Sequence, residues 1–116
     1  MDQKKLLKLL EEFLKWYKRF PYFYMCSGID EFYCRMKYVE NEYSCSIEAH
    51  KVKLYLKEEC DNLPDDIAEK VGRVSSHPYD LWFEGGHDNR LMFLEYVIDK
   101  LKNNINNENS NNTVLH

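Results

Sequence analysis

Apolar side chains recur at every third or fourth position along residues 3–19, the spacing that places them on one face of an α-helix. Pro21 follows this segment, and the residue before a proline avoids the helical region of the backbone. The sequence therefore predicts an amphipathic helix that ends close to residue 20. The positions of its apolar stripe are Leu6, Leu9, Leu10, Phe13, Leu14, Trp16, Tyr17 and Phe20.

Three later segments carry the spacing or the end signals of helices. Ser27 is suited to cap a helix that follows it, and Asp88 is suited to cap the last helix of the chain. Between them, Pro64 and Gly72 bracket a short helix over residues 65–71. The apolar positions of the two capped helices are Ile29, Phe32, Tyr33 and Met36 in the first, and Leu91, Leu94, Val97, Ile98, Leu101 and Ile105 in the last.

Residues 46–60 fit two kinds of structure. Ala49, Val52 and Leu56 share a helical face, but residues 43–49 and 52–56 also alternate as a pair of strands would. We favour a helix, because the segment is rich in Glu and Lys and no tight turn separates the two stretches. The expected fold is therefore mostly α, a compact bundle of four to five helices. The fallback is an α+β fold with a small hairpin around residues 32–57.

The length of 116 residues corresponds to one domain. From residue 103 onward the chain becomes a low-complexity run dominated by asparagine, which cannot bury a core. The sequence thus predicts a single globular helical domain over residues 1–102 and a disordered Asn-rich tail over residues 103–116.

Composition and charge argue against several classes of protein. At 44% hydrophobic and 15% aromatic residues the chain is too apolar to be disordered, yet no apolar run reaches the roughly 18 residues that span a bilayer. The first residues are charged and do not resemble a signal peptide, so we expect a cytoplasmic protein without a membrane partner. Net charge is −4, and only residues 1–19 carry a basic excess, so nucleic acid is not expected as a partner.

The four cysteines are expected to be structural thiols. A reducing cytosol keeps thiols free, and no CxxC spacing suggests a zinc or redox site. Nothing near Cys26 marks it as a nucleophile activated by His50 or His87, so we expect no enzyme. The four residues are Cys26, Cys34, Cys45 and Cys60.

The loop over residues 77–90 is the most unusual segment, since it combines large aromatic side chains with glycines and histidines. Such loops are common recognition surfaces, although the same aromatic residues can serve only to anchor the loop to the core. Its histidines and carboxylates lack the HxH or HxxxH spacing of a metal site, and Glu84 and Asp88 oppose a phosphate at Gly85-Gly86. We therefore expect neither a metal nor a cofactor.

Arg90 has two interpretations: it pins the loop by pairing with Asp80 or Glu84, which is the safer one, or it binds an acidic partner. Nine tyrosines exceed what a core of this size needs, and surface tyrosines favour interfaces, although an AT-rich genome would raise their number too. The predicted partner-binding residues are Tyr22, Tyr24, Tyr79, Trp82, Phe83 and Arg90.

Three groups of residues resemble small uncharacterised proteins of bacteriophages and prophages. They are Cys26 to Ile29, Leu54-Tyr-Leu56 ahead of Leu63-Pro64, and above all Trp82-Phe83, Gly86 and Arg90-Leu-Met-Phe-Leu94. The resemblance spans roughly residues 6–102 and implies a phage-like setting, with the host cytoplasm as location, but no activity.

With these features we expect a non-enzymatic accessory protein that binds a host or phage protein, with counter-defence or host takeover as its role. The alternative is a small-ligand or nucleotide-binding protein that uses loop 77–90. Association between copies of the chain stays open.

Overall fold

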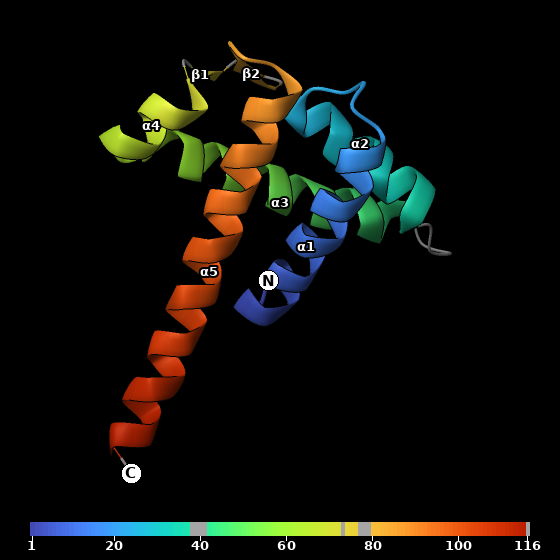
Figure 1. Ribbon diagram of the computed structural model, residues 1–116. Helices are drawn as coiled ribbons and strands as arrows, with labels where there is room; N and C mark the ends of the chain where they lie inside the picture. The colour runs from blue at the N-terminus through green and yellow to red at the C-terminus, as the bar shows by residue number, and fades with distance from the viewer. Residues whose placement is uncertain (38–41, 73, 77–79, 116) are drawn as a thin grey trace.

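The computed structural model describes residues 1–37, 42–72, 74–76 and 80–115. Within them the chain forms five helices and one two-stranded hairpin, so the predicted helical bundle is confirmed (Figure 1). In chain order the elements are α1 (Gln3–Arg19), α2 (Met25–Met36), α3 (Glu42–Asp61), α4 (Asp65–Val71), β1 (Val74–Ser76), β2 (Leu81–Phe83) and α5 (His87–Leu115).

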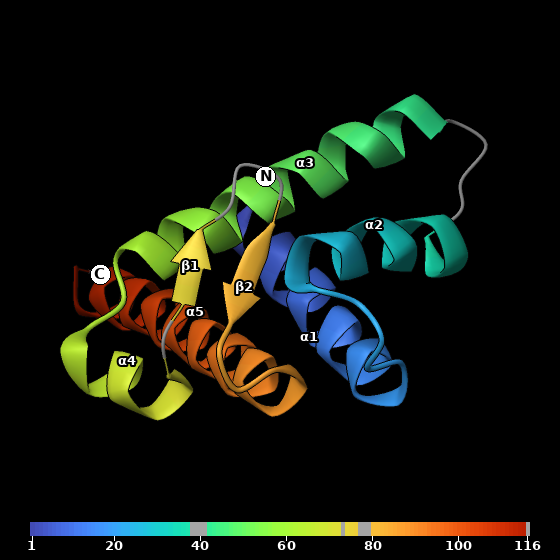
Figure 2. The ribbon, with the colours of Figure 1, turned by 90° about the horizontal axis from the view of Figure 1, so that it is seen from above.

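Two helix pairs enclose the core. Helix α1 lies along α5, and α2 lies along α3, while α4 and the hairpin pack against the first half of α5 (Figures 1 and 2). Aromatic rings of α1 and α2 meet at the centre, where Phe13 stacks on Tyr17 at 4.9 Å and touches Phe32 edge-on at 5.6 Å. The hydrophobic side chains with at most 1% of their surface exposed are Leu10, Phe13, Tyr17, Met25, Cys26, Ile29, Val52, Leu56, Val71, Leu81, Phe93, Leu94, Val97 and Leu101.

The first helix confirms its predicted bounds. Asp2 caps its N-terminus by accepting a hydrogen bond from the Lys4 amide at 3.0 Å, and Lys18 and Arg19 lie in the last turn, where the helix dipole favours cations. The apolar stripe faces the interior. The helix ends one residue before Phe20, as the proline at 21 predicts.

Two helix starts differ from their predicted caps. Helix α2 begins at Met25, so Ser27 lies inside its first turn instead of capping it. Helix α5 begins at His87, which places Asp88 in the first turn rather than at the cap. For α2 the reason is an acceptor from a distant part of the chain, described below.

Residues 42–61 form the continuous helix α3, which settles the ambiguity of that segment in favour of the helix. The fallback hairpin around residues 32–57 does not form, since its described residues lie in α2 and α3. A hairpin forms instead between β1 and β2, with Val74 opposite Phe83 and Ser75 opposite Trp82. Strands of three residues are too short for their alternation to be read from sequence.

The Asn-rich segment, predicted to be a disordered tail, continues as helix to Leu115. Of the side chains that the structure describes in this segment, Ile105 is buried and those of residues 106–108 are exposed. Once α5 is formed, each further residue adds one backbone hydrogen bond at little cost, so the backbone can remain helical without burying side chains. No helix in the described part of the chain has the length and apolar character to cross a membrane.

Candidate functional site

The hairpin, the first turn of α5 and the connection between α1 and α2 lie together at one end of the molecule (Figures 1 and 2). We call this region, residues 20–27 and 80–90, the aromatic end. It contains five of the six residues predicted to bind a partner; the sixth, Tyr79, lies outside the described residues.

Asp80 joins the hairpin to α2. Its Oδ1 accepts hydrogen bonds from the backbone amides of Cys26 at 2.7 Å and Leu81 at 2.8 Å. Its Oδ2 accepts from the Ser27 hydroxyl at 2.6 Å and the Ser27 amide at 3.2 Å. The amides of Cys26 and Ser27 are those that a helix-capping side chain normally satisfies, and a carboxylate is favoured there by the helix dipole.

The capping position of α2 is occupied by Tyr24, whose side chain makes no capping hydrogen bond. Asp80, 54 residues away from Cys26, supplies the missing acceptor. The loop is therefore pinned by Asp80 on α2. The predicted pairing of Arg90 with Asp80 or Glu84 does not appear among the ion pairs of the described residues.

Arg90 is buried, with 7% of its surface exposed. Its guanidinium carbon lies 6.0 Å from the centre of the Tyr17 ring and 5.7 Å from that of the Tyr24 ring. In the described part of the structure, no hydrogen-bond partner is present for its Nε. The sequence predicted an arginine paired with Asp80 or Glu84, or one exposed to an acidic partner, because charged side chains are rarely buried without an ionic partner.

Tyr17 and His87 line the same cluster. The Tyr17 hydroxyl donates a hydrogen bond to the backbone carbonyl of Phe23, and burial raises its pKa to about 12 although Arg90 opposes the rise. The His87 ring meets the Tyr17 ring edge-on at 5.0 Å, and within the described residues neither of its nitrogens has a hydrogen-bond partner. Burial and then the charge of Arg90 lower the pKa of His87, against a smaller opposing effect of Asp88.

Three aromatic side chains of the aromatic end are exposed to solvent: Tyr22 at 81%, Tyr24 at 53% and Trp82 at 44%. Trp82 points outward because the residues on either side of it in β2 point inward. Phe83 is one of those two, with 2% of its surface exposed and its ring 5.3 Å from that of Phe93. The prediction that Phe83 contacts a partner is corrected by this burial, since Phe83 is part of the core.

Gly85 and Gly86 serve the turn into α5. Gly86 has a φ of +77°, which side-chain-bearing residues rarely adopt. A Cβ on Gly85 would lie 2.1 Å from Nδ2 of Asn89, which itself donates to the Val71 carbonyl at 2.6 Å. The sequence predicted a turn here, but no pattern in it indicated the hydrogen bond from Asn89 to the end of α4.

The cysteines that the structure describes, Cys26, Cys34 and Cys60, are free thiols. Burial, reinforced by Asp80, raises the pKa of Cys26 to about 12, and burial and Asp61 raise that of Cys60 to about 11. Cys34 is exposed, and the side chain of Cys45 lies outside the described residues. A thiol with a raised pKa is a poor nucleophile at neutral pH. In the same described part of the chain, no three His, Cys, Asp or Glu side chains are placed to hold a metal ion.

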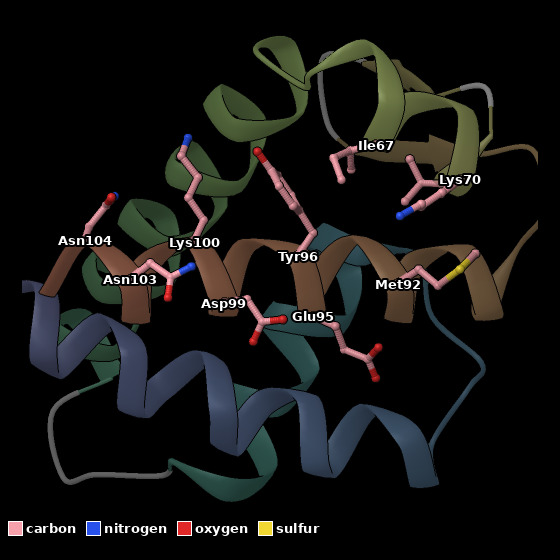
Figure 3. A pocket seen from close by; sticks show the side chains of 10 residues that line it. Ile67, Lys70, Met92, Glu95, Tyr96, Asp99, Lys100, Asn103 and Asn104 are labelled. Atoms are coloured by element: carbon pink, nitrogen blue, oxygen red, sulfur yellow. The ribbon is translucent and has the colours of Figure 1, made fainter. Parts of the chain in front are cut away.

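An open groove of about 570 Å³ lies away from the aromatic end, between α4 and α5 (Figure 3). Its wall carries the apolar residues Ile67 and Met92 together with charges of both signs. Figure 3 shows Tyr96 and Lys100 on one side of α5 and Glu95 on the other, and Lys100 is held by Glu59 at 2.8 Å. This mixture of apolar and oppositely charged side chains selects no single ligand chemistry. None of the residues predicted to bind a partner lines the groove.

Comparison of the chain with protein-family models, with curated proteins and with solved structures gives no match. The resemblance to phage proteins consequently stays a prediction.

Proposed function

We propose that this chain is a non-enzymatic accessory protein of a bacteriophage or other mobile element, and that it acts by binding a host protein through the aromatic end. Counter-defence or redirection of host machinery is the role that such binding would serve. The phage setting rests on the sequence resemblance alone, whereas the binding surface rests on the geometry.

The observation that carries the proposal is the exposure of Tyr22, Tyr24 and Trp82 on adjoining segments. Tyrosine and tryptophan are enriched at protein interfaces, since they supply a large contact area at little cost in side-chain entropy. Single exposed apolar residues are ordinary on any protein surface. Three large rings at one end of a small domain exceed that expectation.

Hydrogen bonds and buried neighbours hold the backbone that carries Tyr24 and Trp82. The Asp80 carboxylate joins the start of β2 to the start of α2 by accepting hydrogen bonds from Cys26 and Ser27. The segments that carry Trp82 and Tyr24 are therefore linked to each other. Leu81 and Phe83 anchor the strand in the core on both sides of Trp82. A surface that is already ordered before binding loses less entropy when the partner arrives.

Capture of a partner tests the proposal. The intact protein, immobilised and exposed to lysate of the cells that carry its gene, should retain a defined protein. Trp82→Ala and Tyr22→Ala should each weaken retention about tenfold or more, as expected for central aromatic contacts. Met36→Ala is the matched control, because Met36 is 59% exposed but lies at the far end of α2.

Equal retention by Trp82→Ala and Met36→Ala would reject the aromatic end as the binding surface. The alternative, a small-ligand or nucleotide-binding protein using loop 77–90, predicts a different result. In that case no protein is captured, and nucleotides raise the melting temperature of the wild-type chain but not that of Trp82→Ala.

A further inference from the structure

Arg90 is a buried cation with an unused donor. A buried guanidinium is costly unless paired, and contacts with aromatic faces recover only part of that cost. Here Tyr17 and Tyr24 supply such faces, while Nε has no acceptor among the described residues. Asp80, one of the two acids that the sequence offered as its partner, directs both of its carboxylate oxygens to α2.

The surroundings of Arg90 favour an anion. Arg90 lies in the first turn of α5, where its amide makes the first helical hydrogen bond, to Gly86 at 3.1 Å. The amides that precede it have no acceptor within the helix, and the positive end of the dipole attracts negative charge. His87 adds two ring nitrogens without partners in the described structure, and burial together with the charge of Arg90 lowers its pKa, which favours the neutral ring.

The charge of the cluster selects a monoanion. One arginine beside a neutral histidine gives a single positive charge. Glu84 and Asp88 are both exposed at the same turn and would repel a dianion such as phosphate. A carboxylate carries one negative charge and matches the paired donors of a guanidinium.

Tyr24 is the cover through which such a group would enter. Nε of Arg90 is closed to solvent in the free protein, so a ligand has to displace something. Tyr17 is fully buried, whereas Tyr24 has 53% of its surface exposed and presents one face to the guanidinium. Tyr24 also belongs to the proposed binding surface, so a partner bound there would contact the ring that covers Arg90.

We propose that Arg90 binds an aspartate or glutamate carboxylate presented by the partner protein, which displaces the Tyr24 ring and docks between Tyr22 and Trp82. This inference rests on the proposed function and adds the chemistry of the partner: an acidic side chain surrounded by apolar surface. Arg90 then acts as a specificity residue beneath an aromatic rim.

The first measurement of the test uses the unaltered protein, and no part of the test depends on an Arg90 variant that would not fold. The Nε–H resonance of Arg90 is followed by ¹H–¹⁵N NMR at pH 7 and constant ionic strength during titration with acetate. Acetamide, which has the same shape without the charge, is the matched control ligand. Arg35 is the internal control, because its Nε already donates to Glu31 at 3.0 Å.

We expect acetate to shift the Arg90 resonance with saturation, while acetamide leaves it in place and the Arg35 resonance does not saturate. Tyr24→Ala should tighten acetate binding about two- to fivefold, the factor that corresponds to an exposed cation–π contact. Met36→Ala should leave acetate binding unchanged, since Met36 is exposed at the far end of α2, outside the proposed binding surface.

No saturable shift with acetate, a larger shift with phosphate, or no effect of Tyr24→Ala would each overturn the inference. The titration needs no protein partner, so its failure is distinct from failure of the capture experiment. If the protein captures a partner through Trp82 but does not bind acetate, the proposed function is retained and the inference that Arg90 binds a carboxylate is rejected.

Discussion

Replacing Asp80 by alanine removes the acceptor at the N-terminus of α2. The carboxylate accepts from two amides and one hydroxyl of α2, and from its own neighbour Leu81. Loss of a capping side chain typically costs about 1 kcal/mol and at most ~2 kcal/mol, and an additional charged hydrogen bond raises this. We therefore expect Asp80→Ala to lower the free energy of unfolding by about 2 kcal/mol.

For a domain of this size, 2 kcal/mol corresponds to a fall of ~8 °C in melting temperature. Urea unfolding followed by circular dichroism measures the free energy, and a thermal scan measures the melting temperature. Asp30→Ala is the matched control: Asp30 also lies in α2, but it makes an exposed ion pair with Lys53 at 2.9 Å. Such surface pairs contribute at most about 1 kcal/mol.

A double-mutant cycle isolates the contact itself. Ser27→Ala removes the hydroxyl that donates to Asp80 at 2.6 Å. If the two residues act together, the double variant should lose about 1 kcal/mol less than the sum of the single changes. Additive losses, or a cost of Asp80→Ala no greater than that of Asp30→Ala, would refute the assignment of Asp80 as the cap of α2.

Three further outcomes follow from the geometry. Because burial lowers the pKa of His87, the unfolded chain binds more protons than the folded one, so the free energy of unfolding should decline as the pH falls below about 6.5. His87→Gln should reduce that decline, as measured by urea unfolding at several pH values. The same decline in His87→Gln as in the wild type would contradict this assignment. Gly85→Ala should cost about 1–3 kcal/mol, because its Cβ would clash with the amide of Asn89; a wild-type melting temperature would contradict this. A thiol reagent at pH 8 should label the exposed Cys34 quickly and the buried Cys26 only after denaturation, as read by mass spectrometry, and equal rates would contradict the assigned burial.

The long helices could be predicted because their side chains repeat over several turns. In α1 the apolar positions continue for 17 residues, and the proline at 21 marks the end. In α3 the periodicity was ambiguous, and helix propensity decided it correctly. These signals are local, so they are present in the sequence whatever the remainder of the chain does.

The first residue of α2 and the existence of the β1–β2 hairpin both depend on contacts between distant residues. The sequence predicted neither of them correctly. Ser27 has the chemistry of a cap, but its amide already donates a hydrogen bond to Asp80. Helix α2 therefore begins at Met25, three residues earlier than a cap at Ser27 predicts. Nothing near Asp80 in the sequence indicates an acceptor for a helix 54 residues away. Strand pairing over three residues likewise leaves no readable pattern.

The candidate site was predicted in part. Composition drew attention to loop 77–90, but it could not decide which aromatic residue faces solvent: Trp82 is 44% exposed and Phe83 beside it 2%. A shift of one position in a strand reverses every side chain, so this choice depends on the register with β1. The burial of Arg90 against Tyr17 required the packing of α1 on α5, which no local pattern encodes.

The bond from Asp80 to α2 also constrains the order in which the chain folds. The amides of Cys26 and Ser27 gain their acceptor only when a loop of more than fifty residues has closed. The first turn of α2 and the β-hairpin should therefore open and close as one cooperative unit, with similar hydrogen-exchange protection for the amides of Cys26, Ser27 and Leu81. In this fold, a helix near the N-terminus is completed by a strand close to the C-terminal third of the chain.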